Sequence, residues 1–204
     1  TLSSFASIKP PVGSDFDVTC NRVGIVWDTS ASRKTHDKKV DMEIVKLLAQ
    51  KLGKNAKLDF IPFADAMGQP VTLTMTGNTH TDNSAIERHL NDLKYDGGTN
   101  LSSLKLSKGP TFEHTTDTYA YYCLFTDGMH NMSTKSMPDV LEAPVYIFAS
   151  SAESNTSLLK ILSRKSGGEY FKFTTSSNTS QLKQAVDGLG APVFSFLGFN
   201  IDST

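Results

Sequence analysis

The chain has 204 residues, which is enough for one domain around a single buried core. Its 20 basic and 21 acidic side chains leave a net charge of -1, so the charge balance gives no footprint for nucleic acid or an anionic membrane. Hydrophobic residues form 38% of the chain, as in ordinary soluble domains, and no apolar stretch reaches the roughly 18 to 20 residues of a membrane span.

Strand and helix patterns alternate along the sequence. Apolar residues at the i, i+4, i+7, i+8 spacing of a helix follow short apolar runs typical of strands. The segment Ser84-Ala85-Ile86-Glu87 matches a helix-capping box, so a helix is expected to begin there. The expected elements in chain order are an N-terminal arm (1–20), a strand (23–27), a helix (38–52), two strands (58–63 and 71–75), a helix from residue 84, two strands (119–125 and 144–149), a helix that ends at 167–168, a strand (170–173) and a last helix with residues 182–189.

This alternation predicts the fold class and the domain organisation. Residues 21–190 are expected to form one α/β domain, in which helices flank a doubly wound, mainly parallel sheet. Residues 191–204 begin with the apolar run Ala191-Pro192-Val193-Phe194, which predicts an extra terminal β segment or the start of a further module. The chain begins with Thr1 rather than Met, so we expect it to be a piece of a longer protein with other domains beside it.

Polar segments follow two of the predicted strands, and a third such segment lies between them. The first strand runs into Asp28-Thr29-Ser30-Ala31-Ser32, the middle segment reads Asp96-Gly97-Gly98-Thr99-Asn100, and the strand at 119–125 runs into Thr126-Asp127-Gly128. In an open α/β sheet, ligands bind outside the carboxyl ends of the strands near a topological switch point. Asp28 and Asp127 are therefore expected to converge. One or two carboxylates together with neutral hydroxyls suit Mg²⁺.

These three segments, in this order, resemble the metal-ion-dependent adhesion site of the von Willebrand factor type A (vWA) family. The family pattern is Asp-x-Ser-x-Ser, then a Thr, then an Asp after a later strand. The resemblance implies a Rossmann-like vWA fold in which Ser30 and Ser32 bind the metal directly and Thr99 binds it when ligand is present. It implies that Asp28 and Asp127 act directly or through water.

The resemblance also implies a function. Mg²⁺ is the implied cofactor, with Mn²⁺ or Ca²⁺ as alternatives, and an Asp or Glu of a protein partner would complete the coordination. The expected function is a metal-dependent protein-binding or adhesion module without enzymatic activity, in an extracytoplasmic or cell-surface location. The expected rim of the ligand-binding site comprises Arg33, Gly98, Asn100, Gly128 and His130.

Two residues depart from the family pattern, and one suggests a subfamily. Ala31 replaces the Gly of many members, and Arg33 replaces a Met, so that its cation either attracts an anionic partner or is simply solvated. Trp27, directly before Asp28, resembles the type A domains of inter-alpha-trypsin inhibitor heavy chains.

Other readings of the same residues stay open. Asp28 and Asp127 could accept backbone N–H bonds, although two converging carboxylates raise the pKa of one unless a cation intervenes. Ser30 and Ser32 could cap a helix. The domain could be a structural scaffold of a larger protein. A metal-dependent phosphohydrolase with Asp28 as nucleophile lacks its customary second carboxylate, and no G-x-S-x-G elbow or phosphate-binding loop indicates another enzyme.

Overall fold

A six-stranded sheet forms the centre of the protein. The computed structural model describes residues 21–108, 118–129 and 137–190. The strand order is β3-β2-β1-β5-β7-β8, and every neighbouring pair is parallel except β2 with β3. The strands are β1 (Arg22–Asp28), β2 (Lys57–Phe63), β3 (Val71–Thr74), β5 (Tyr121–Phe125), β7 (Val145–Ala149) and β8 (Tyr170–Lys172). A short parallel pair, β4 (Lys105–Leu106) with β6 (Val140–Leu141), lies beside the main sheet.

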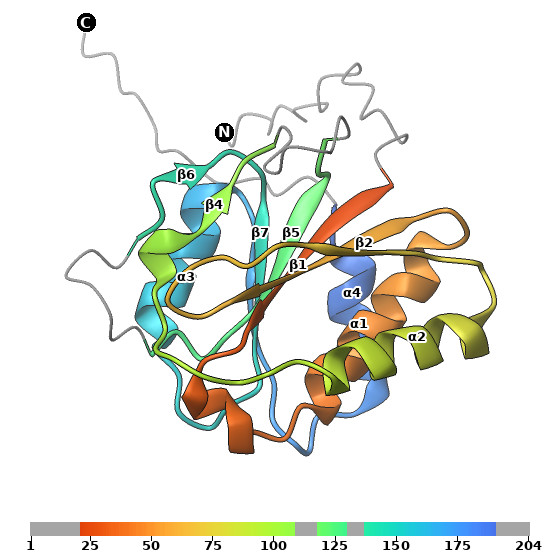
Figure 1. Cartoon of the computed structure of the whole chain (residues 1–204), viewed down its shortest axis with the longest axis horizontal. Helices are drawn as coiled ribbons and strands as arrows, with labels where there is room; N and C mark the ends of the chain where they lie inside the picture. Colours follow the sequence, from red (N-terminus) through yellow and green to blue (C-terminus); the bar gives the residue numbers. More distant parts are fainter. Residues whose placement is uncertain (1–20, 109–117, 130–136, 191–204) are drawn as a thin grey trace, which may run out of the picture.

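Helices cover both faces of the sheet (Figure 1). The helices α1 (Lys39–Leu52), α2 (Thr79–Asn91) and α4 (Thr179–Gly188) pack on one face, and α3 (Thr156–Ser166) packs on the other. The short 3-10 helices are η1 (Ala31–Thr35) and η2 (Leu101–Ser103). Each face has its own hydrophobic cluster, so β1 and β5 are buried on both sides, as their continuous apolar runs predict. The predicted doubly wound α/β fold is confirmed.

The predicted start of the second helix is wrong. The helix α2 begins at Thr79, where the side chain of Asn78 accepts a hydrogen bond from the Thr81 amide. Ser84 lies inside the helix, and its hydroxyl donates to the His80 carbonyl oxygen four residues back, at 2.8 Å. A Ser hydroxyl can bond in this way within a helix as well as at its start, so the Ser-x-x-Glu spacing alone did not fix the boundary.

A closed polar network lies where the parallel strands begin, which we call the amino edge of the sheet. Arg22 Nε and Asp59 Oδ2 form a buried ion pair at 2.7 Å. The Tyr119 hydroxyl donates to the same oxygen at 2.6 Å, and the Thr72 hydroxyl donates to Asp59 Oδ1 at 2.7 Å. The Asp59 carboxylate is therefore fully neutralised by the protein's own donors.

Both ends of the segment 21–190 lie at this amino edge. The Asn21 carbonyl oxygen accepts from the Lys57 amide at the start of β2. Gly190, just after α4, donates its amide to the hydroxyl of Tyr146 near the start of β7. No helix among the described residues is long and apolar enough to cross a membrane. The predicted arm at 1–20 and the predicted extension at 191–204 lie outside the described residues.

Candidate metal site

The polar loops meet at the topological switch point of the sheet. From β1 the chain continues outward to β2 and β3, whereas from β5 it continues in the opposite direction to β7 and β8. The register pairs Trp27 with Phe125, so Asp28 is level with Thr126, and Asp127 lies one residue farther along. Neighbouring parallel strands that diverge in this way leave a crevice beyond their carboxyl ends, where ligands bind in such folds.

Asp28 is completely buried at the end of β1. Its Oδ2 accepts from the Thr126 hydroxyl at 2.6 Å, and its Oδ1 accepts from the Ser30 amide at 2.9 Å. Burial raises the pKa of Asp28, and the hydrogen bonds from Thr126 and Ser30 and the charge of Arg33 offset this only in part. The raised pKa thus has burial as its main cause, not the repulsion between carboxylates that the sequence suggests.

The two serine hydroxyls of the first loop lie side by side. Ser30 Oγ and Ser32 Oγ are 3.1 Å apart. Ser30 occupies the N-cap position of η1, but its side chain makes no capping hydrogen bond, so the alternative that it serves as a cap is not supported. Two ligands in neighbouring positions of an octahedron with metal–oxygen distances of about 2.0–2.1 Å lie about 2.9 Å apart. The spacing of the hydroxyls is therefore compatible with a shared Mg²⁺.

Backbone hydrogen bonds join the middle loop to the first. The Ala31 amide donates to the Gly97 carbonyl oxygen at 3.0 Å, and the Asp96 amide donates to the Thr29 carbonyl oxygen at 2.9 Å. Gly97 has a φ of 75°, a conformation that favours glycine at this turn. Thr99, two residues later, is buried with 1% of its surface exposed. Thr99 is therefore held beside the Asp28–Ser32 loop although nearly seventy positions separate them in the chain.

Asp65 is a functional candidate that the sequence reading missed. Its Oδ1 accepts from the Gly98 amide at 2.7 Å, and its carbonyl oxygen accepts from the Asn100 side chain at 3.0 Å. These bonds use two predicted rim residues, Gly98 and Asn100, to fix the loop that carries Thr99. Asp65 follows the buried strand β2 by two residues, so the same strand-end rule that selected Asp28 contained the signal for it.

Asp127 is held by the loop that leads to α3. Its Oδ1 accepts from the Met129 amide at 2.9 Å, and its carbonyl oxygen accepts from the Asn155 amide at 2.8 Å. Gly128 between them has a φ of 70°, and a Cβ there would lie 2.8 Å from the Leu159 side chain. Asp127 itself is 6% exposed. The predicted rim residue His130 lies outside the described residues.

The expected position of Arg33 on the rim is wrong. Its side chain is 1% exposed and points into the protein, where Nη2 lies 2.6 Å from Asp41 Oδ2. The turn of η1 directs Ser32 outward and Arg33 inward, and the buried carboxylate of Asp41 in the first turn of α1 receives the guanidinium. The alternative that Arg33 is simply solvated is wrong as well.

The donor set determines which ion would fit. Among the described residues, no group of three or more His, Cys, Asp or Glu side chains could hold a metal. The loops instead carry two carboxylates and three hydroxyls, all oxygen donors, at the positions of Asp28, Ser30, Ser32, Thr99 and Asp127. Oxygen donors with few charges fit a hard divalent cation that keeps part of its water shell, and they do not fit zinc.

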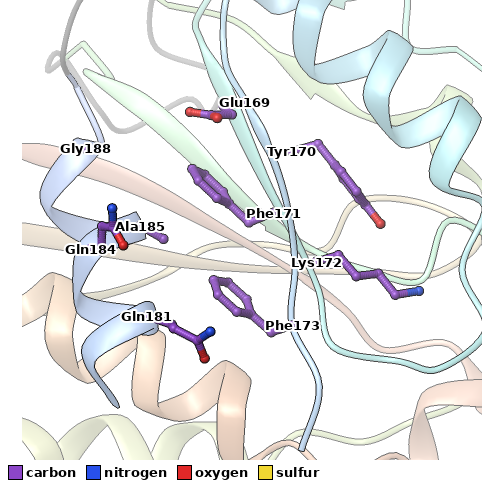
Figure 2. Close-up of a pocket in the computed structure, with 9 residues that line it drawn as sticks. All are labelled: Glu169, Tyr170, Phe171, Lys172, Phe173, Gln181, Gln184, Ala185 and Gly188. Atoms are coloured by element: carbon purple, nitrogen blue, oxygen red, sulfur yellow. The ribbon is translucent and has the colours of Figure 1, made fainter. Parts of the chain in front are cut away.

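A cavity of about 410 Å³ lies away from this edge, between β8 and α4. Figure 2 shows the rings of Phe171 and Phe173 with the amides of Gln181 and Gln184 around it. The two rings are nearly parallel, with centroids 6.4 Å apart. The side chain of Lys172 points away from the cavity, and its ammonium group donates hydrogen bonds to the Ala152 carbonyl oxygen and the Ser154 hydroxyl. The cavity contains no arrangement of nucleophile, base and acid, so it does not indicate an active site.

The sheet order and the polar loops at the switch point define a class. The chain has the fold of von Willebrand factor type A domains, because solved structures of that class superpose on most of it. No protein-family model matches the chain, and no curated protein matches it in sequence. The similarity to solved structures therefore establishes the fold.

Three solved structures illustrate the likeness. A von Willebrand factor type A protein from Catenulispora acidiphila has a TM-score of 0.56 at 14% identity, covering 84% of this chain and 42% of its own. Proximal thread matrix protein 1 of the mussel byssus has a TM-score of 0.57 at 12% identity, covering 83% and 45%. Manganese-loaded TRAP protein of Plasmodium vivax has a TM-score of 0.54 at 12% identity, covering 85% and 76%. The chain spans less than half of the first two proteins.

Proposed function

We propose that this domain binds a protein partner through a divalent cation held at the carboxyl edge of the sheet. The cation would be held by Asp28, Ser30, Ser32, Thr99 and Asp127. The observation that carries the proposal is the junction of three distant loops at the switch point, where two serine hydroxyls lie 3.1 Å apart beside a buried carboxylate. An Asp or Glu of the partner would complete the coordination.

Each residue has a role in this proposal. The hydroxyls of Ser30, Ser32 and Thr99 would bind the ion as neutral ligands, while Asp28 and Asp127 would balance its charge directly or through water. The cation, when bound, supplies an electrophilic position that attracts a carboxylate. Mg²⁺ is the proposed ion, with Mn²⁺ or Ca²⁺ as alternatives. The manganese-loaded TRAP protein, which has the same fold, supports a divalent cation.

An enzymatic function is less well supported. As the nucleophile of a phosphohydrolase, Asp28 would have to attack phosphorus directly, but its side chain is completely buried and both oxygens accept hydrogen bonds. The same burial favours the role of Asp28 through water over direct binding of the cation. We therefore propose a binding module rather than an enzyme. The resemblance to the vWA family supports an extracytoplasmic or cell-surface location for it. Trp27 is buried and donates its indole N–H to the Tyr95 hydroxyl at 2.9 Å, so a structural role accounts for it without the heavy-chain subfamily.

Calorimetric titration of chelator-treated protein with Mg²⁺ and Mn²⁺ tests the metal site. We expect one saturable site, with affinity at least tenfold weaker in Ser30→Ala and in Asp127→Asn because each loses one ligand. Asp187→Asn is the matched control, since this exposed carboxylate lies in α4. No binding by the unaltered protein at millimolar metal, or equal binding by Ser30→Ala, would contradict the proposal.

Selection from a displayed peptide library tests the partner chemistry. Peptides are captured in Mg²⁺ and eluted with EDTA. We expect the eluted peptides to share an Asp or Glu, and replacement of that residue by Asn or Gln to abolish binding. Peptides that remain bound in EDTA, or that tolerate the replacement, would show that the domain binds by another surface.

A further inference from the structure

A buried ion pair adjoins the first loop of the proposed metal site. Arg33 follows Ser32 in the chain, and its guanidinium is enclosed together with the carboxylate of Asp41, which is fully buried in α1. Within the described part of the chain, Arg33 Nε, Arg33 Nη1 and Asp41 Oδ1 are shielded from solvent and have no hydrogen-bond partner. A single bond at 2.6 Å therefore holds two buried charges that retain unused donors and an unused acceptor.

Of the two charges, Arg33 belongs to the first loop of the site, because it lies in the same 3-10 helix as Ser32, whereas Asp41 lies in α1. Burial raises the pKa of Asp28, and the charge of Arg33 is one of the smaller effects that oppose this rise, so the guanidinium acts on the first loop of the site. His36 also contacts the pair, with Nε2 at 3.6 Å from Asp41 Oδ2 and at 2.8 Å from the Ser150 hydroxyl. Lys38 adds a second cation, with its ammonium 4.4 Å from the centre of the Tyr95 ring.

The positive charge of Arg33 repels a divalent cation that binds at the proposed site. Arginine side chains carry a fixed positive charge, and charges interact more strongly in a buried environment than in water. Asp41 screens part of the Arg33 charge. The net field at the metal position therefore depends on the balance between Arg33 and Asp41, both of which lie outside the proposed ligand set.

We propose that the Arg33–Asp41 pair sets the metal affinity of the site, with Arg33 weakening the binding of a divalent cation and Asp41 limiting that effect. This inference rests on the proposed metal site. A site weakened in this way binds its cation more tightly when a partner carboxylate adds negative charge. Thermodynamic linkage makes this effect reciprocal: the factor by which the partner increases the affinity for the metal equals the factor by which the metal increases the affinity for the partner.

Titration of three variants with Mg²⁺ at pH 8, where ordinary histidines are neutral, tests the inference. Arg33→Met removes the cation and is expected to tighten binding by about tenfold. Asp41→Asn leaves the cation without its counter-charge and is expected to weaken binding by about tenfold. Lys34→Met makes the same charge change at the next, exposed position of η1, and solvent screening is expected to keep its effect below about twofold.

The opposite signs separate an electrostatic role from a structural one. Loss of packing or of fold would weaken metal binding in both buried variants, and the melting temperature of each variant in EDTA reports that loss independently. Weaker or unchanged binding in Arg33→Met, with its fold retained, would overturn the inference. If Arg33→Met does not fold, unchanged or tighter binding in Asp41→Asn overturns it instead. If the unaltered protein binds no Mg²⁺, the proposed function itself fails.

Discussion

At the scale of single residues, Asp28 combines burial with charge. Burial removes the carboxylate from solvent, and two hydrogen bonds and the charge of Arg33 offset this only in part, so the pKa of Asp28 is raised in the folded domain. A divalent cation would reverse this shift. The metal-free domain is therefore expected to gain stability when the charge of Asp28 is removed, whereas the metal-bound domain depends on that charge.

Asp28→Asn tests this expectation. A folded pKa above the unfolded value means that the native state binds more protons in the interval between the two values, so the free energy of unfolding falls as the pH rises through that interval. At pH 7 in EDTA, the variant should melt a few degrees above the unaltered protein, since about 1 kcal/mol corresponds to about 2–4 °C in a domain of this size. The difference should shrink toward pH 4.

The control for this comparison is Asp187→Asn, which alters an exposed carboxylate. Added Mg²⁺ should raise the melting temperature of the unaltered protein and leave that of Asp28→Asn unchanged. A lower melting temperature of Asp28→Asn at pH 7 in EDTA would show that the hydrogen bonds to Asp28 outweigh its burial.

The sequence predicted some of these residue positions and missed others. Asp28 and Asp127 were predicted to converge because they end apolar strands, and the structure brings their loops together at the switch point. The roles of two other residues were not predicted: the Thr126 hydroxyl donates to Asp28, and Asp65 accepts from the Gly98 amide. Hydrogen bonds between distant loops leave no local pattern in the sequence. Arg33 was misplaced because its partner Asp41 lies on the next helix, and a pairing across elements cannot be read from spacing.

At the scale of elements, the close fit of β1 against β5 depends on one glycine. Gly24 is paired with Tyr122 in the register, and a Cβ at position 24 would lie 2.2 Å from Cδ1 of that ring. Tyr122 is completely buried, and its hydroxyl donates to the Ser107 carbonyl oxygen at 2.8 Å. Neither strand can shift easily, because both are paired on both sides. The absence of a side chain at Gly24 therefore lets β1 and β5, which lead to the proposed site, pack closely together.

Gly24→Ala is expected to destabilise the domain by about 1–3 kcal/mol or more, because overpacking forces a buried ring from its position. Urea denaturation measures the change. Gly188→Ala is the matched control, since a Cβ there meets no atom within 4 Å, and it should be neutral or slightly stabilising.

A double-variant cycle identifies the cause. If the clash with the ring is responsible, Gly24→Ala should have a much smaller effect when Tyr122 is already replaced by Leu. Additive effects of the two substitutions would locate the strain elsewhere in the sheet.

Element types were easier to predict than element boundaries. The apolar period of α1 and its stop at Gly53 are local properties, and the structure confirms both. The start of α2 was wrong because Asn78 and Ser84 offer competing caps, and the turn after β3 decided between them. The strands β4 and β6, with two residues each, were missed because so short a pairing has no periodicity.

At the scale of the whole molecule, the two edges of the sheet differ in how their charges are balanced. The amino edge is closed by Arg22 and Asp59, which neutralise each other together with the Tyr119 and Thr72 hydroxyls. The carboxyl edge joins loops from β1, from the segment before η2 and from β5, but it contains a buried carboxylate with a raised pKa. A cation at this edge would therefore stabilise the tertiary structure as well as bind a ligand.

Thermal denaturation with increasing Mg²⁺ measures this stabilisation. At a free metal concentration of about 100 times the dissociation constant, we expect a gain of about 2.7 kcal/mol. That gain corresponds to a rise of about 5–11 °C at about 2–4 °C per kcal/mol. Ser30→Ala at the same metal concentration should gain no more than about 1.4 kcal/mol, because its affinity is expected to be at least tenfold weaker. An equal rise in both proteins would indicate nonspecific ion effects rather than a site.

The position of the two ends of the described domain, at residues 21 and 190, has a practical consequence. Asn21 and Gly190 both lie at the amino edge, whereas the proposed site lies at the opposite edge of the sheet. A linker attached directly at residue 21 or at residue 190 of a domain trimmed to these residues would direct the loops of Ser30 and Asp127 toward the solution. Analytes should therefore reach these loops at the same rate whichever end is anchored.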